Sequence, residues 1–256
     1  MKPLTVLLLL SVSFVLPVHA ESHAEPTVDV LNPTNLTATI YPGLNSSNVL
    51  FTFRRRASQS NTTTQVLREY LRPDGAIVAR ERVHYESGQL ASYELEEPLT
   101  GAHGRAVIQS DPKNSRERTV LFEYAAGPNN PVRTAREPLR TDTLMNDMVG
   151  PFIETHWDTL LAGEPVRFRF LALARRETVG FKLVKQSEST WRGRPVVILK
   201  MEPSSWVIGQ LIDPLLFTVE KDPPHRVLHY IGRTTPRIQI GDSWKDLDAL
   251  TVFDWH

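Results

Sequence analysis

Short runs of alternating apolar and polar residues, divided by turn residues, most constrain what this chain can fold into. Alternation with a period of two is typical of β-strands that bury one face. In the first half of the chain it predicts strands at 49–56, 64–72, 77–86, 90–97, 104–110 and 119–125. Asp and Gly at 72–75 and Ser-Gly at 86–89 favour tight hairpin turns, because these residues tolerate a left-handed backbone. The pattern indicates an antiparallel meander.

Between residues 141 and 163 the apolar period lengthens to three and four residues, which indicates an amphipathic helix. Its apolar positions are Leu144, Met145, Met148, Phe152, Ile153, His156, Trp157, Leu160 and Leu161. Gly150-Pro151 should kink this helix or split it in two, and Gly163 should end it.

After this helix the alternation resumes and predicts strands at 166–174, 178–185, 196–202, 215–221, 226–232 and 250–255. The apolar stretch 204–213 suggests a short inserted helix. Two small sheets or one long sheet would satisfy this strand count. We expect a mainly β (α+β) domain over 49–256, with one curved antiparallel sheet, or unclosed β-barrel, wrapped around the kinked helix that covers its apolar face.

The N-terminus has the pattern of a secretory signal peptide. Lys2 precedes the apolar stretch 4–16, Pro17 breaks it, and Val18-His19-Ala20 offers small residues for cleavage after Ala20. The apolar stretch is shorter than the roughly 20 residues that span a bilayer, so we expect a periplasmic protein whose mature chain has no transmembrane segment. Residues 21–48, rich in Pro, Asn, Thr and Ser, predict a loosely ordered arm or an early edge segment.

Composition narrows the classes of function. The chain has 0 Cys, which excludes disulfides, cysteine nucleophiles and thiolate metal sites, and the absence of cysteine in an exported chain of this length favours a periplasm. With 29 basic and 29 acidic residues, nothing suggests a nucleic-acid partner. No nucleophile elbow, phosphate-binding loop, dinucleotide glycine cluster or zinc-binding helix motif occurs. We therefore expect no enzyme and no cofactor.

Two groups of residues have side chains of the kind that bind metal ions. His225 and His229 lie in a predicted strand, where four residues separate them by roughly 13 Å, too far to share an ion. Asp242, Asp246 and Asp248 lack the glycine and the terminal glutamate of a calcium loop. Ordinary strand histidines and a solvated acidic loop are the favoured interpretations, and no metal site is predicted.

Glu81 and His156 are the remaining candidates for chemistry. Glu81 shares the apolar face of its predicted strand with Ala79 and Val83, and a buried carboxylate must find a partner or a proton. We expect an inward Arg or Tyr as its partner, or an exposed edge strand, rather than a catalytic acid. His156 falls on the apolar helix face and is expected at the core or at the edge of a groove.

Large, soft side chains are abundant near the predicted helix and the later strands. Such side chains form ordinary cores, and they also line adaptable apolar pockets. The candidate ligand-binding residues are Met145, Met148, Phe152, Trp157, Phe168, Phe170, Phe181, Met201, Trp206 and Phe217.

A signal peptide, no cysteine, antiparallel strands curling around one helix and a short late apolar helix together resemble the half-barrel periplasmic proteins of the lipoprotein-carrier (Lol-like) type. The stretch 215–230 also looks like strand pairs in uncharacterised periplasmic domains of that type. The resemblance covers about 49–256, is topological, and transfers no catalytic residue. It implies a concave apolar face for acyl chains with helices as a lid.

Two functions follow from these features. The first is a carrier of a lipid or lipoprotein acyl chain, with the candidate ligand-binding residues as lining and Gly150-Pro151 as a lid hinge. The second is a structural or interaction module of the cell envelope with a filled core, which pairs with a protein partner. An enzyme with an unmarked site around Glu81 or His156 is the third and least supported.

Overall fold

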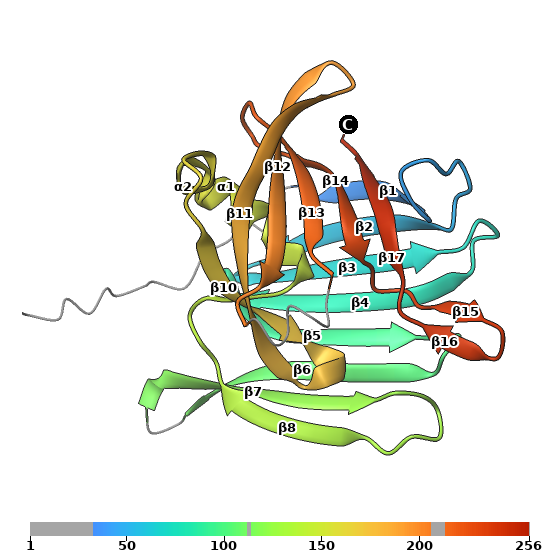
Figure 1. Cartoon of the computed structure of the whole chain (residues 1–256). Coiled ribbons are helices and arrows are strands. Elements are labelled where there is room, and N and C mark those ends of the chain that lie inside the picture. The colour runs from blue at the N-terminus through green and yellow to red at the C-terminus, as the bar shows by residue number, and fades with distance from the viewer. Residues whose placement is uncertain (1–32, 112–113, 206–212, 256) are drawn as a thin grey trace, which may run out of the picture.

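The computed structural model describes residues 33–111, 114–205 and 213–255. The described residues are mostly β-structure, with 61% of them in strands, and their main body is one large, curved, unclosed sheet. Figure 1 shows the strands of the first half running across the molecule behind those of the second half. The expected fold class is confirmed.

The first half of the chain contributes eight strands. They are β1 (Asn35–Tyr41), β2 (Phe51–Ser60), β3 (Thr63–Leu71), β4 (Ile77–Glu86), β5 (Gln89–Glu97), β6 (Ala102–Asp111), β7 (Asn114–Ala125) and β8 (Arg133–Pro138). Each strand from β1 to β7 pairs with the next one in antiparallel register. The predicted meander is confirmed, and it extends one strand further at each end.

The second half contains short helices and the remaining strands. They are β9 (Thr143–Leu144), η1 (Asn146–Met148), α1 (Val149–Thr155), α2 (Trp157–Leu161), β10 (Val166–Ala172), η2 (Leu173–Arg175), β11 (Glu177–Trp191), β12 (Arg194–Pro203), β13 (Leu215–Glu220), β14 (Val227–Arg233), β15 (Ile238–Ile240), β16 (Ser243–Lys245) and β17 (Asp248–Asp254).

The 15-stranded sheet runs in the order β8-β7-β6-β5-β4-β3-β2-β1-β17-β14-β13-β12-β11-β10-β9. β1 and β17 join the two halves, so the alternative of two separate main sheets is wrong. The sheet curls until its ends approach each other: the backbone N–H of Thr178 in β11 donates to Glu137 Oε1 in β8 at 2.7 Å. Only β15 and β16, among the described strands, form a separate two-stranded sheet.

For residues 35–41 the prediction of a loosely ordered arm or an early edge segment over 21–48 is wrong in both forms. These residues form β1, which lies between β2 and β17 in the interior of the sheet. The sequence Asn35–Tyr41 does alternate, and Leu36, Ala38 and Ile40 are buried. Its Asn and Thr residues face outward, and they made the segment look like a polar loop in the sequence. Its two neighbouring strands, β2 and β17, come from opposite ends of the chain.

The prediction of one kinked helix over 141–163 needs correction. Thr143 and Leu144 are extended and pair with β10, and Met145 is extended as well (φ −128°, ψ 174°). The helical part is split at His156 rather than at Gly150-Pro151. Pro151 lies in the first turn of α1, where the N–H that proline lacks would have had no helical partner.

Some short strands of the structure have no counterpart in the sequence prediction. β8, β15 and β16 were not predicted, because they are short or carry little apolar alternation. The signal peptide at 1–20 and nearly all of the apolar stretch 204–213 lie outside the described residues. None of the described helices is long and apolar enough to cross a membrane.

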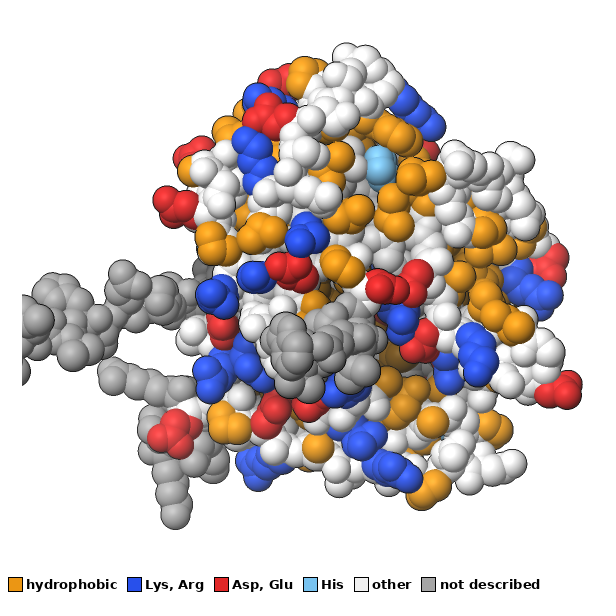
Figure 2. Space-filling model, in the orientation of Figure 1, with side chains coloured by type: hydrophobic (Ala, Val, Ile, Leu, Met, Phe, Trp, Pro, Cys, Tyr) orange, Lys and Arg blue, Asp and Glu red, His pale blue; other side chains and the backbone are white. Residues whose placement is uncertain are grey.

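The two outer faces of the sheet differ in character. On β2 to β7, cross-strand ion pairs form what we call the charged outer face: Arg56–Glu69, Arg80–Glu69, Arg80–Glu96, Arg82–Glu94, Arg82–Glu96 and Arg105–Glu123. On β12, β13, β14 and β17 the same side of the sheet carries Ile198, Leu216, Ile231 and Val252, which we call the apolar outer face. Leu216 stands opposite Ile231, while Ile198 and Val252 lie in the neighbouring row, next to Thr218 and His229. All four are half-buried, and Figure 2 shows hydrophobic side chains gathered where these strands face the viewer.

Candidate functional site

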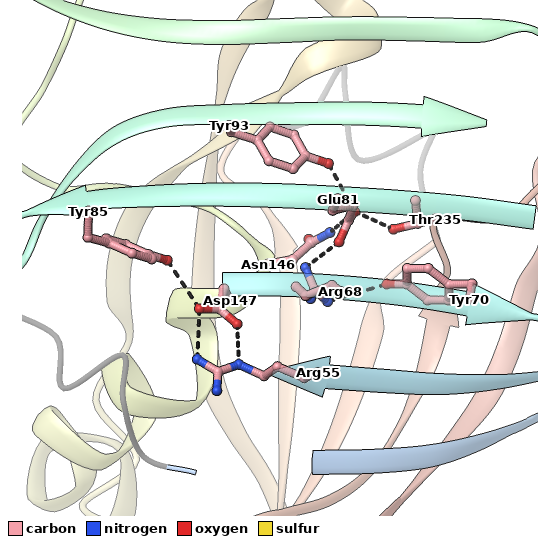
Figure 3. Close-up of polar contacts among 9 residues, drawn as sticks. All are labelled: Arg55, Arg68, Tyr70, Glu81, Tyr85, Tyr93, Asn146, Asp147 and Thr235. Carbon is pink, nitrogen blue, oxygen red and sulfur yellow. Dashed lines mark hydrogen bonds and ion pairs between the residues drawn. The ribbon is translucent and has the colours of Figure 1, made fainter. Parts of the chain in front are cut away.

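A buried polar network lies on the concave side of β2 to β5, where apolar residues would be expected (Figure 3). At its centre Arg68 of β3 stands directly opposite Glu81 of β4. Arg68 Nη1 and Glu81 Oε2 are 2.6 Å apart, and the two side chains are 10% and 0% exposed. The strand register itself therefore creates a buried ion pair.

Glu81 is held by several donors besides Arg68. Its Oε1 accepts hydrogen bonds from the Tyr93 hydroxyl at 2.9 Å and the Thr235 hydroxyl at 2.8 Å, with Asn146 Nδ2 at 3.5 Å. The expectation of an inward Arg or Tyr partner is confirmed, and both are present. The carboxylate of Glu81 therefore has hydrogen-bond or ion-pair partners on both of its oxygens.

The second centre of the network is Asp147 in η1. Arg55 of β2 donates to both of its carboxylate oxygens, at 2.6 and 3.1 Å, and the Tyr85 hydroxyl donates to Oδ2 at 3.2 Å. Arg55 and Asp147 are 6% and 2% exposed in their side chains. This bidentate pair fastens η1 to β2, because a guanidinium with two hydrogen bonds to one carboxylate fixes the geometry of both side chains (Figure 3).

Burial sets the protonation of the tyrosines in the network. It raises the pKa of Tyr93 well above its ordinary value, and the neighbouring Glu81 raises it further. Burial likewise raises the pKa of Tyr85, with Asp147 adding to the effect. Both hydroxyls keep their protons at neutral pH and act as donors, which suits the carboxylates they face.

Arg68 retains one polar atom without a partner. Burial by itself disfavours its charge, but Glu81, Tyr70, Asp147 and Tyr93 together raise the pKa of Arg68 above its ordinary value. Its Nη2 lies 3.3 Å from the Tyr70 hydroxyl, whereas Nε has no hydrogen-bond acceptor among the described residues. The cluster is thus a nearly complete internal clamp rather than a set of groups facing an open cleft.

The structure brings the candidate ligand-binding residues together. Met145, Met148, Phe152, Trp157, Phe168, Phe181, Met201 and Phe217 are buried in one cluster, and Phe170 packs against it partly buried. Trp206 lies outside the described residues. Their rings contact one another: Phe168 lies 5.2 Å from Phe152 and 6.2 Å from Phe181. Within the described chain these residues fill space with each other.

Of two hollows in the described part of the chain, only the smaller one touches a candidate ligand-binding residue, Met148. One, of about 550 Å³, is open and lined by polar residues of the β2–β3 hairpin from Ser58 to Thr63, with Gln65. The other, of about 20 Å³, lies beside Leu90, Leu139 and Met148. The first has the wrong chemistry for an acyl chain, and the second has room for about one water molecule.

The histidines and the acidic cluster have ordinary surroundings. His225 stacks on Trp157 with ring centres 4.0 Å apart, and His229 contacts Trp191 at 4.2 Å. Burial lowers the pKa of His229, with Arg192 adding to the effect. Asp246 and Asp248 pair with Arg233, at 2.6 and 3.0 Å.

His156 lies at the break between α1 and α2. Its ring is 4.2 Å from the ring of Phe152, and its Nδ1 is 3.0 Å from the Phe152 carbonyl oxygen. These contacts agree with the expected position at the edge of the core.

Sequence reasoning missed most of the buried polar network. Glu81 was singled out, but Arg55, Arg68 and Asp147 were not. Alternation alone places Arg68 on the same face as Val66 and Tyr70, so the signal was present in β3. The partner of Arg55, in contrast, lies 92 residues away, and no local pattern indicates it.

Comparison with known proteins gives little beyond the chain itself. No protein family matches the sequence, and no curated protein matches it. Among solved structures, one match is the crystal structure of a beta-barrel-like protein of domain of unknown function DUF1849 from Brucella abortus. The identity is 9%, the match covers 87% of this chain and 96% of that chain, and the TM-score is 0.29. The description of the fold therefore rests on this chain's own strands.

Proposed function

We propose that this protein is an exported, non-enzymatic interaction module of the cell envelope, working with a filled core. One observation carries the proposal: the residues with the best chemistry for lining an apolar pocket pack against each other in a single core cluster. The N-terminal signal-peptide pattern supports export to the periplasm. The buried ion pairs Arg55–Asp147 and Arg68–Glu81 favour a rigid protein, because both carboxylates already have partners inside it.

The apolar outer face is the surface proposed to meet a protein partner. Ile198, Leu216, Ile231 and Val252 are half-buried and lie outside the residues packed on the core clusters. Thr218 and His229 lie between Ile198 and Val252 in the register. In the neighbouring row Lys200, which is paired with Glu202, stands opposite Leu216 at the edge of this face. A mainly aliphatic sheet face with charged residues at its edge has the character of the centre and rim of a protein interface.

The first experiment is native mass spectrometry with organic extraction on protein purified from its own envelope without detergent. The proposal expects an apo mass for the chain, or a complex with a second protein. A lipid-sized mass bound to the chain contradicts the filled core and favours the carrier function instead.

The interface is tested by substitution. Leu216→Asp and Ile231→Asp should each abolish co-purification of the partner, because a charge placed in the centre of an apolar interface is desolvated without a counter-ion. Glu94→Ala on the charged outer face is the matched control and should leave co-purification unchanged. If the aspartate variants are folded and still capture the partner, the apolar outer face is not the interface.

A hydrophobic-ligand carrier remains the second candidate, favoured by one observation. The segment from η1 to α2 is short, its helices have no side-chain caps, and it covers Phe168 and the cluster around it. Such a segment is a natural lid. A carrier predicts that Phe170→Asp abolishes ligand uptake while export is preserved.

A further inference from the structure

We propose that one end of the sheet, here called the apolar rim, is a docking surface for a lipid bilayer. Four large hydrophobic side chains are exposed in the described part of the chain: Leu44 at 61%, Leu99 at 44%, Val132 at 54% and Ile240 at 58%. The topology places all four at the same end of the sheet, each at or near the tip of a different connection.

The strand register fixes this arrangement. In an antiparallel meander, alternate connections lie at the same end, so the β1–β2, β5–β6 and β7–β8 loops share one rim. β14 ends and β17 begins at that rim too, since Arg233 pairs with Asp248 and Leu250 pairs with Tyr41 at the end of β1. The β15–β16 hairpin between them, with Ile240, therefore projects from the same end, as Figure 1 shows.

The opposite rim provides the contrast within the same sheet. Its β2–β3 turn consists of Asn61 and Thr62, and its β4–β5 turn of Ser87 and Gly88. No exposed large hydrophobic residue belongs to either of these two turns. Among the described residues, the exposed aliphatic side chains therefore lie at one rim and not at the β2–β3 and β4–β5 turns of the other.

The apolar rim is a pre-organised surface. Arg237, just before β15, donates to Glu97 and to the Thr100 hydroxyl, and Glu97 is 4% exposed. A Cβ at Gly101 would lie 2.5 Å from Pro128 Cδ, so the β5–β6 and β7–β8 loops are closely packed. Leu99, Val132 and Ile240 are thus presented from connections that are held together at their bases.

The chemistry of the rim fits a bilayer better than a protein groove. The loops at 42–50, 98–101 and 126–132 contain no charged residue. The β3–β4 turn adds Arg72 and Asp74, and the segment 234–247, which carries Ile240, adds Arg237, Asp242, Lys245 and Asp246, so the charges of these connections sum to zero. The aliphatic tips are carried singly on separate loops that span about 30 Å across β1 to β8. Separate tips can each enter a fluid apolar interface, whereas a protein partner favours one contiguous patch.

The experiment is sedimentation of the purified protein with vesicles of phosphatidylcholine. The expected result is binding that is unchanged between low and high salt, because the positive and negative charges of these connections balance. Leu44→Ser, Leu99→Ser, Val132→Ser and Ile240→Ser should each weaken partitioning by about fivefold, and all four together by more than a hundredfold.

Two matched sets of variants keep the test sharp. The same four positions changed to Met should bind within about threefold of the unaltered protein, since the apolar area is kept. Thr62→Ser on the opposite rim should change nothing. Urea unfolding of each variant checks the fold, which exposed positions of this kind leave intact.

Several outcomes overturn the proposal. Failure of the unaltered protein to bind phosphatidylcholine does so, as does full binding by the fourfold serine variant. Binding only to phosphatidylglycerol vesicles and its loss in salt would mean electrostatic recruitment instead. If the serine variants lose a protein partner but still bind vesicles, the rim is a protein interface. The apolar outer face of the proposed function uses other residues, so the two proposals fail independently.

Discussion

The two halves of the sheet fill the same interior by different means. Beneath β10 to β13, the space is taken by apolar side chains such as Phe168 and Leu183. Beneath β2 to β5 it holds two ion pairs, Arg68–Glu81 and Arg55–Asp147, with tyrosine donors around them. An apolar core accepts many side chains of similar volume, whereas a buried ion pair needs each partner in place. The polar half therefore fixes which segments meet, and the apolar half supplies bulk stability.

The largest effect should follow from removing one partner of the central ion pair. Glu81→Ala leaves Arg68 charged and buried without its counter-ion, so we expect a loss of about 3–5 kcal/mol in the free energy of unfolding. Urea denaturation measures it. Glu94→Ala, whose ion pair lies on the charged outer face, should cost about 0.5 kcal/mol or less. Equal losses in the two variants would remove the distinction between buried and exposed pairs.

A truncation in the apolar half should be somewhat less damaging. Leu183 is fully buried in β11, and Leu183→Ala removes apolar contacts and leaves a cavity, at an expected cost of about 3 kcal/mol in the free energy of unfolding. Leu183→Met is the control of similar volume and should cost less than about 1.5 kcal/mol. A loss below about 1 kcal/mol for Leu183→Ala would mean that this half repacks easily and is not the rigid core described above.

Replacing both partners of the central pair tests what the polar half is for. Arg68→Met with Glu81→Leu removes both charges together, and we expect the free energy of unfolding to lie within about 1–2 kcal/mol of the unaltered protein. The double variant should thus be more stable than Glu81→Ala alone. If it is as unstable as the single variant, the surrounding groups, including Tyr93 and Thr235, depend on the charges.

The smallest effect concerns acid stability and an exposed cluster on the β11–β12 hairpin. Lys185 and Lys221, bonded to Glu188, lower the pKa of this carboxyl to about 2. A folded-state pKa below the ordinary value stabilises the fold above about pH 4.5, and this contribution is lost as the pH falls toward 2. Glu188→Gln should remove that small part of the pH dependence between pH 4.5 and 2, measured by thermal unfolding at each pH. An unchanged pH profile would show that solvent screens the cluster completely.

The positions of most strands could be predicted from the sequence, but the order in which they pair and the curvature of the sheet could not. Alternation located most strands of the sheet, and the burial of Glu81 beside Ala79 and Val83 followed from the same period. β1 escaped detection because its neighbours, β2 and β17, come from opposite ends of the chain. Residues 141–163 were predicted as one helix because their apolar period says which side is buried, but not whether the backbone pairs with a strand such as β10.

By itself, then, the sequence determined a cysteine-free, strand-rich chain with a short helical segment, a signal-peptide pattern and one buried carboxylate in need of a partner. Only the tertiary structure decided that Arg68 and Asp147 belong to one polar network, that the large apolar side chains fill the core, and that four aliphatic tips share one rim. The physical reason is the separation along the chain over which each effect acts. Period and turn chemistry act over a few residues, whereas cross-strand register and curvature bring together groups that are separated by up to most of the chain.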